Sequence, residues 1–186
     1  METVKKIEIN KIVKVILITL FGSILLTISA KIKIPFYPVP MTMQTFIVLF
    51  LGITFGPKIG LLTVSLYLFE GIIGLPVFAG TPEKGIGFIY FSGPTMGYLL
   101  GFLAATYCAG SFKYDKGKIN IFFKLVFSVS FIYLLGLVWL GLLIGWDKPI
   151  FRLGAQPFLL AELFKILLLL FLTPFLLKAK KITKII

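Results

Sequence analysis

Long apolar stretches, interrupted by short segments rich in glycine, proline and lysine, make up most of the chain. Most of these stretches approach or exceed the roughly 18–20 residues with which a helix crosses the hydrocarbon core of a bilayer. The candidate spans are residues 12–30, 42–56, 58–76, 94–112, 121–144 and 157–177. The pattern predicts an all-α integral membrane protein, a bundle of six transmembrane helices that forms a single transmembrane domain over residues 1–186.

The second candidate span is short, and almost no loop separates it from the third. It runs into Gly56-Pro57-Lys58, where glycine and proline together favour a turn. We therefore expect these two spans to form a tight hairpin. A span this short is either tilted or enters only part of the bilayer.

The composition agrees with a membrane protein. Of 186 residues, 59% are hydrophobic and 14% are charged, whereas a soluble domain is about half apolar and about a quarter charged. The N-terminal stretch has the basic start and apolar centre of a signal peptide. Because further apolar segments follow it, we interpret it as an uncleaved first membrane helix.

The net charge of +12 is unevenly distributed along the chain. With six spans, lysines concentrate at both termini and in the loop of residues 113–124, and fewer basic residues fall on the opposite side. Cytoplasmic segments of membrane proteins carry such an excess of lysine and arginine. This distribution predicts that both termini are cytoplasmic, and it explains the charge without a nucleic-acid partner.

Three segments on the predicted external side are irregular but unusually apolar for loops. Residues 31–44 (KIKIPFYPVPMTMQ) contain three prolines, residues 74–97 are rich in glycine and proline, and residues 146–156 read WDKPIFRLGAQ. Proline excludes an ordinary helix from the first of them. Irregular backbone at membrane depth is tolerated where protein buries it or where it lines a cavity. We expect the three segments to close together over a ligand pocket.

Two charged residues, Glu162 and Lys165, lie inside the last apolar stretch. At a spacing of three residues they share one face of a helix. A charge at the bilayer centre costs roughly 2.5–3.5 kcal/mol on insertion scales, and such residues usually face the protein interior and serve function. We interpret the pair as a donor and an acceptor for a polar ligand; a purely structural ion pair is the alternative.

The residues available for catalysis are few. The chain has no histidine and a single cysteine, Cys108, so it lacks the commonest general base and metal ligand and cannot form an internal disulfide. The segment Gly80–Gly87 has the glycine spacing of a phosphate loop, but Ile86 stands where the lysine is required. We expect no metal site and no enzymatic activity. A small intramembrane enzyme with Glu162 and Lys165 as acid and base is a weaker alternative, and a channel is another.

A further carboxylate, Glu70, falls late in the third span near the predicted external face. We interpret it as an interfacial carboxylate neutralised by a lysine such as Lys31 or Lys84.

Small residues mark two helix faces. Gly97 and Gly101 form a G-x-x-x-G pattern, which lets helices approach closely. A second stripe of small residues on the first span comprises Thr19, Gly22, Ser23 and Thr27. Such a stripe makes a docking face for another helix, which belongs either to this chain or to a partner protein.

Four stretches together resemble the BioY family, the biotin-specific S components of energy-coupling-factor (ECF) transporters. They are IPFYPVPMTMQTFIVLFLG, FGPKIGLLTVSLYLFEGIIGLPVFAGTPEKGIG, GPTMGYLLGF and PFLLAELFK. They cover most of the chain from Ile34 to Lys165 in the order of the family. The proline-rich segment that runs into Met-Thr-Met-Gln-Thr, and GLPVFAG, are specific to the resemblance.

The resemblance implies a six-helix protein of the prokaryotic cytoplasmic membrane that holds one biotin near its external face, under a lid made by the first loop and the loop before the fourth helix. The last helix of the family usually reads Gly-Asp-x-x-Lys; here Lys165 is retained and Glu162 replaces the aspartate. The implied substrate-binding residues are Phe36, Gln44, Phe78, Ala79, Tyr90, Ser92, Gly93, Tyr98, Glu162 and Lys165.

The resemblance also implies the partners. Transport would use a transmembrane coupling subunit, docked through Thr19, Gly22, Ser23 and Thr27, and two cytoplasmic ATPase subunits in the lipid membrane. No cofactor is implied, because biotin is the transported substrate. An S component for another vitamin is the nearest alternative.

Overall fold

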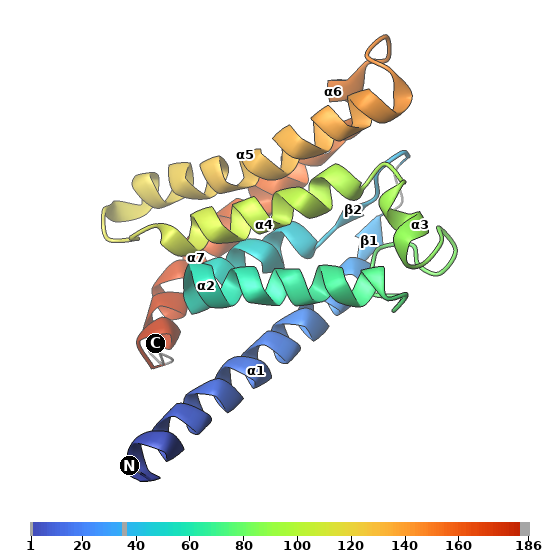
Figure 1. Ribbon diagram of the computed structural model, residues 1–186. Coiled ribbons are helices and arrows are strands. Elements are labelled where there is room, and N and C mark those ends of the chain that lie inside the picture. The colour runs from blue at the N-terminus through green and yellow to red at the C-terminus, as the bar shows by residue number, and fades with distance from the viewer. Residues whose placement is uncertain (1, 35–36, 183–186) are drawn as a thin grey trace.

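The computed structural model describes residues 2–34 and 37–182, which are almost entirely helical (Figure 1). The elements in chain order are α1 (Glu2–Lys31), β1 (Lys33–Ile34), β2 (Met41–Thr42), α2 (Gln44–Ile72), α3 (Phe88–Phe91), α4 (Met96–Ser111), α5 (Gly117–Ile144), α6 (Ile150–Gly154), the 3-10 turn η1 (Gln156–Phe158) and α7 (Leu159–Ile182). This agrees with the predicted helical class.

Four helical stretches are long and apolar enough to cross a membrane among the residues that the structure describes. They are Lys11–Lys31, Gln44–Ile72, Gly117–Ile144 and Ile150–Lys180. The predicted fourth span is the exception, because α4 has only 16 residues, fewer than the roughly 20 of a typical membrane helix.

The helix α2 contains both the second and the third predicted spans. Its backbone is non-helical at Gly56, where φ is 80° and ψ is 177°, and Pro57 follows. The positive φ suits glycine, which has no side chain to clash. The two arms lie against each other, because a methyl group on Gly60 would lie 3.3 Å from the Cα of Gly52. The predicted hairpin is therefore present.

The second arm of α2 ends earlier than predicted, at Ile72 instead of residue 76. Gly74 has a φ of 98°, and Pro76 has no backbone N–H with which to continue a helix. The carbonyl of Glu70 accepts a hydrogen bond from the N–H of Leu75 at 3.0 Å, which closes the helix end. Residues 73–87 consequently form an irregular loop above the bundle.

Glycines bring α4 close to both of its neighbours. A methyl group on Gly52 would lie 2.5 Å from the carbonyl oxygen of Thr106, and one on Gly101 would lie 2.5 Å from the Cα of Ile132 on α5. Figure 1 shows α4 between α2 and α5. The close approach predicted for the G-x-x-x-G pattern is confirmed, and it sets the width of the space between these helices.

The small-residue stripe on α1 faces α2 of the same chain. Thr19, Gly22 and Ser23 are buried, and a methyl group on Gly22 would lie 2.5 Å from Cγ2 of Thr63. Docking of a partner subunit through the stripe stays a prediction. In this arrangement a partner would approach along its edge, where Thr27 is half-buried.

The carboxylate of Glu70 is bonded to that stripe and not to a lysine. Ser23 Oγ donates to Glu70 Oε2. Lys31 turns instead to the loop after α2, where its ammonium donates to the carbonyl oxygens of Pro76, Phe78 and Thr81 at 2.7, 3.0 and 3.2 Å. The prediction that Lys31 or Lys84 neutralises Glu70 was wrong, because a local hydroxyl on α1 already meets the carboxylate.

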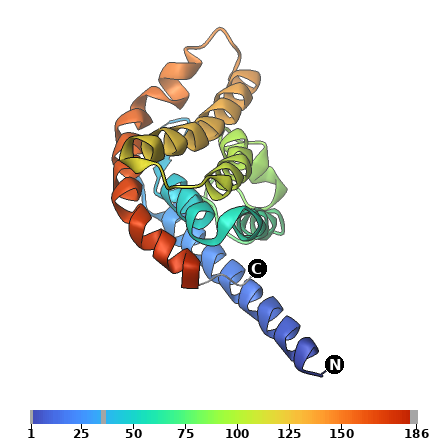
Figure 2. The ribbon, with the colours of Figure 1, turned by 90° about the vertical axis from the view of Figure 1, so that its left-hand side faces the viewer.

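The irregular elements gather at one end of the molecule. β1 and β2 pair antiparallel, with Lys33 opposite Thr42 and Ile34 opposite Met41. Like α3, they lie at the end of the bundle opposite both chain termini (Figure 1). The N-terminal part of α1 projects beyond the other helices (Figure 2). The candidate site lies beneath this end.

Candidate functional site

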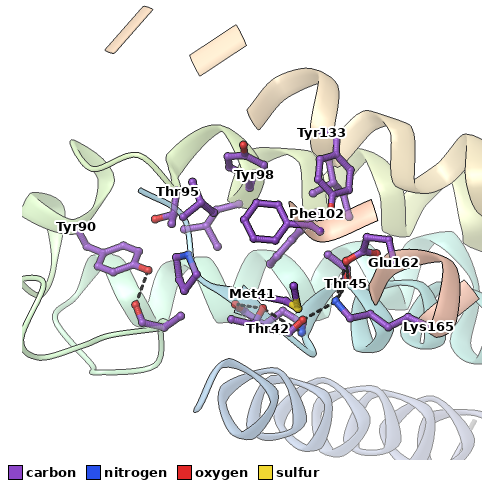
Figure 3. A pocket seen from close by; sticks show the side chains of 17 residues that line it. Met41, Thr42, Thr45, Tyr90, Thr95, Tyr98, Phe102, Tyr133, Glu162 and Lys165 are labelled. Atoms are coloured by element: carbon purple, nitrogen blue, oxygen red, sulfur yellow. Dashed lines mark hydrogen bonds and ion pairs between the residues drawn. The ribbon is translucent and has the colours of Figure 1, made fainter. Parts of the chain in front are cut away.

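A cavity of about 60 Å³ lies between β2, α2, α4, α5 and the start of α7 (Figure 3). Its walls are mainly apolar and aromatic, with a few polar side chains grouped on one side. The lining residues are Val39, Pro40, Met41, Thr42, Gln44, Thr45, Ala79, Tyr90, Thr95, Tyr98, Leu99, Phe102, Ile132, Tyr133, Phe158, Glu162 and Lys165. Ligand pockets are usually about 300–1,000 Å³, so a drug-sized ligand requires the covering segments to move outward.

Glu162 supplies the cavity with a carboxylate that is only 5% exposed. Its Oε1 accepts hydrogen bonds from Lys165 Nζ at 2.7 Å and from Thr45 Oγ1 at 2.8 Å. Its Oε2 is buried and has no hydrogen-bond partner within the described part of the chain. A buried acceptor without a donor costs about 1–3 kcal/mol, more when it is charged, so this oxygen is suited to a donor that arrives with a ligand.

Lys165 uses its donors within the protein. Its ammonium donates to the carbonyl oxygen of Thr42 at 2.6 Å, to Thr45 Oγ1 at 3.0 Å and to Glu162 Oε1 at 2.7 Å. An ammonium has three N–H donors, and these three bonds account for all of them. Lys165 therefore fixes Glu162 and ties β2 to α7.

Aromatic side chains form the walls of the cavity opposite Glu162 and Lys165. Tyr98 donates its hydroxyl to the carbonyl oxygen of Gly154 at 2.8 Å, so its ring and not its oxygen serves the cavity. Phe102 lies beside it, and Tyr133 on α5 directs its hydroxyl toward Glu162 (Figure 3). The result is an aromatic slot closed at one end by a carboxylate, which suits a flat, largely apolar ligand with hydrogen-bond donors at one end.

Comparison with known proteins identifies the family of this chain. The model of the BioY family matches residues 2–182. The chain belongs to the BioY family. A probable biotin transporter BioY of Pyrococcus horikoshii is 37% identical over 152 residues, which are 82% of this chain and 88% of the relative. The biotin transporter BioY of Thermotoga maritima is 34% identical over 143 residues, 76% of this chain and 83% of the relative.

A solved structure has the same fold. The crystal structure of the S component for biotin from an ECF-type ABC transporter is similar with a TM-score of 0.72 and 25% identity, over 94% of this chain and 93% of that one. BioY proteins are transporter components, so the predictions of the family and of a transport subunit that is not an enzyme are confirmed.

Six of the residues that the BioY resemblance implied lie around the cavity. They are Gln44, Ala79, Tyr90, Tyr98, Glu162 and Lys165. Gln44 donates its amide to the hydroxyl of Tyr67 at 2.7 Å, which joins the two arms of α2 at the cavity. The structure thus brings together residues from four separate parts of the sequence.

The other implied residues lie elsewhere. Phe78 is buried behind the cavity, with its ring stacked on that of Tyr90 at 4.8 Å. Ser92 is exposed and donates to the carbonyl oxygen of Ile89, and the carbonyl oxygen of Gly93 accepts from the indole of Trp139 at 2.9 Å. Phe36 lies outside the described residues.

The loop before α4 is held over the cavity by Tyr90. Its hydroxyl donates to the carbonyl oxygen of Ala79 at 2.8 Å. Burial raises the pKa of the Tyr90 phenol, so the hydroxyl keeps its proton, and its donor role, at neutral pH.

The sequence interpretation missed several lining residues. Thr42 and Thr45 stood in the Met-Thr-Met-Gln-Thr segment that carried the family resemblance, and their spacing of three residues next to a helix start was an available signal. Ile132 and Tyr133 gave no signal, because the second half of α5, residues 131–144, is apolar on every side. Only the packing of α5 against α4 selects the face that lines the cavity.

Proposed function

We propose that this chain is the biotin-capturing S component of an ECF-type transporter. It binds one biotin from the external side of a prokaryotic cytoplasmic membrane and passes it inward together with a transmembrane coupling subunit and two ATPase subunits. Membership of the BioY family and the likeness to a solved biotin S component support this function.

The free oxygen of Glu162 is the observation that carries the proposal. Biotin has a bicyclic ring, a ureido group with two N–H donors and one carbonyl acceptor, and a carboxylate tail. Glu162 Oε2 is buried and accepts no hydrogen bond of ordinary geometry from the described residues, although the Tyr133 hydroxyl is directed toward this carboxylate (Figure 3). A ureido N–H is a donor of the right kind for this oxygen. A hydrogen bond to a charged group contributes about 1.5–3 kcal/mol.

This chemistry also sets the orientation of the ligand. A carboxylate placed beside Glu162 would bring two like charges together in a buried site, which disfavours ionisation of both. Lys165 offers no remaining donor to compensate. The ureido ring therefore enters first and the carboxylate tail points outward.

Six membrane crossings follow from the same proposal: α1, the two arms of α2, α4, α5 and α7. The short α4 can cross with fewer residues than the other helices, because the irregular loop of residues 73–87 covers its external end. The lysines at both termini, together with Lys58 at the hairpin turn, support a cytoplasmic position for these ends.

Calorimetric titration of the purified protein in lipid nanodiscs tests the proposal. We expect saturable 1:1 binding of biotin and no binding of thiamine, which lacks a ureido group. Lys165→Ala should weaken biotin binding because Glu162 loses its fixed position. A parent protein that binds no biotin would refute the proposed function.

A further inference from the structure

A second cavity, of about 350 Å³, lies outside the first one and adjoins it. It is lined by the external loops and by the start of α4: Tyr37, Pro38, Lys84, Tyr90, Gly93, Pro94 and Thr95. Tyr90 and Thr95 line both cavities. We name this second space the outer cavity.

Lys84 is the charged residue among the described residues that line the outer cavity. Its side chain is exposed, and the two ion pairs of the described residues, Lys148 with Asp147 and Lys165 with Glu162, do not include it. The positive charge of Lys84 is therefore available to a ligand.

A tight turn determines where Lys84 lies. The N–H of Lys84 donates to the carbonyl oxygen of Gly80 at 2.8 Å, and the N–H of Gly85 donates to that of Pro82 at 2.9 Å. Gly80 has a φ of 80°, and a methyl group on it would lie 2.9 Å from Cδ of Lys84. The aliphatic stem of Lys84 is thus packed on the backbone of the turn, and Lys84 lines the outer cavity from there.

We propose that Lys84 receives the carboxylate tail of the incoming ligand, and that the outer cavity is an antechamber that selects monoanionic ligands. This inference rests on the proposed function, because it assigns the end of the ligand that Glu162 does not hold. The two cavities divide the ligand by charge: the negative Glu162 lies at the inner end and the positive Lys84 at the outer end. An exposed charge at such a rim acts mainly on the association rate and its salt dependence.

Stopped-flow fluorescence in zwitterionic nanodiscs, which measures the rate of ligand association, tests this role of the outer cavity. Trp139 is a suitable reporter because its indole donates to Gly93, which lines the outer cavity. The ligands are biotin and its uncharged methyl ester, and the variants are Lys84→Glu and Lys84→Gln. Lys33→Glu is the matched control, since Lys33 is an exposed lysine of the adjacent β1 that does not line the outer cavity.

We expect Lys84→Glu to slow biotin association by about threefold to tenfold at low salt. The effect should shrink at high salt, where surface charges are screened. Lys84→Gln should give a smaller effect of the same sign, and neither variant should change association of the methyl ester. Lys33→Glu should leave biotin association unchanged.

Three results would overturn the inference. One is an unchanged rate for biotin with Lys84→Glu at low salt. Another is an equal change for biotin and the methyl ester, which would mark a structural effect of the loop. A parent protein that binds neither ligand would refute the proposed function as well, and this distinguishes the two failures.

Discussion

At the scale of single residues, the site is organised by three side chains that bond to one another. Thr45 donates to Glu162 and accepts from Lys165, and Lys165 donates to Glu162. Both bonds to Glu162 reach the same carboxylate oxygen, Oε1, and they leave Oε2 for a ligand. The bonds to Oε1 therefore stabilise the pair of charges in an apolar setting, whereas the unbonded Oε2 is unfavourable until a donor arrives.

Thr45 should matter for binding although it carries no charge. Thr45→Val keeps the shape of the side chain but removes the hydroxyl, so Glu162 and Lys165 each lose one hydrogen bond. We expect biotin affinity to fall by roughly 1–2 kcal/mol, or about five- to thirtyfold. Thr45→Ser retains the hydroxyl and should bind nearly as the parent does. Equal losses in both variants, measured by calorimetry, would contradict the role of the hydroxyl.

At the scale of elements, the helices could be predicted from the sequence, and the residues with which the loops form contacts could not. Apolar runs of membrane length and the Gly56-Pro57 break determine α1, α2, α5 and α7 from local sequence alone. The short strands β1 and β2 depend on a contact between residues about eight apart across prolines, and no alternating pattern marks them. The partner of Lys31 lies more than forty residues away, and only the packing of α1 against α2 brings the two together.

Lys31 should act on the site through the loop that follows α2. Its ammonium holds the carbonyl oxygens of Pro76, Phe78 and Thr81, and Ala79 between them lines the cavity. In Lys31→Met we expect faster amide hydrogen exchange in residues 77–85 and biotin binding weakened by about five- to thirtyfold. Lys148→Met, at a lysine paired with Asp147, should change neither quantity. Unaltered amide exchange in Lys31→Met would show that the loop keeps its conformation without the hydrogen bonds from Lys31.

At the scale of the whole molecule, the irregular segments around the cavities and the lysine-rich chain termini lie at opposite ends. The loop of residues 73–87, the strands β1 and β2, and α3 lie opposite the two termini (Figure 1). Residues of this loop and of α3 line both cavities. The lysine-rich ends of the chain lie at the other end, as the positive-inside rule requires of a cytoplasmic face. Under the proposed function, the ligand would load at one end of the molecule and the partner subunits would act at the other.

This orientation can be measured with single cysteines. Cys108 is the sole cysteine of the sequence, so Cys108→Ala gives a background without thiols. In intact cells a membrane-impermeant maleimide should label Lys148→Cys but not Lys58→Cys, and permeabilised cells should label both. Labelling of Lys58→Cys before Lys148→Cys would show that the chain is inserted the other way round.

The central claim is that the free oxygen of Glu162 receives a ureido N–H, and a binding cycle tests it most directly. Biotin and analogues methylated at each ureido nitrogen in turn are titrated into the parent protein and into Glu162→Gln, and the coupling between the two changes is calculated. We predict that methylation of one nitrogen weakens binding to the parent by about tenfold or more and weakens binding to Glu162→Gln far less. Losses of the same size in both proteins, for both nitrogens, would contradict the account.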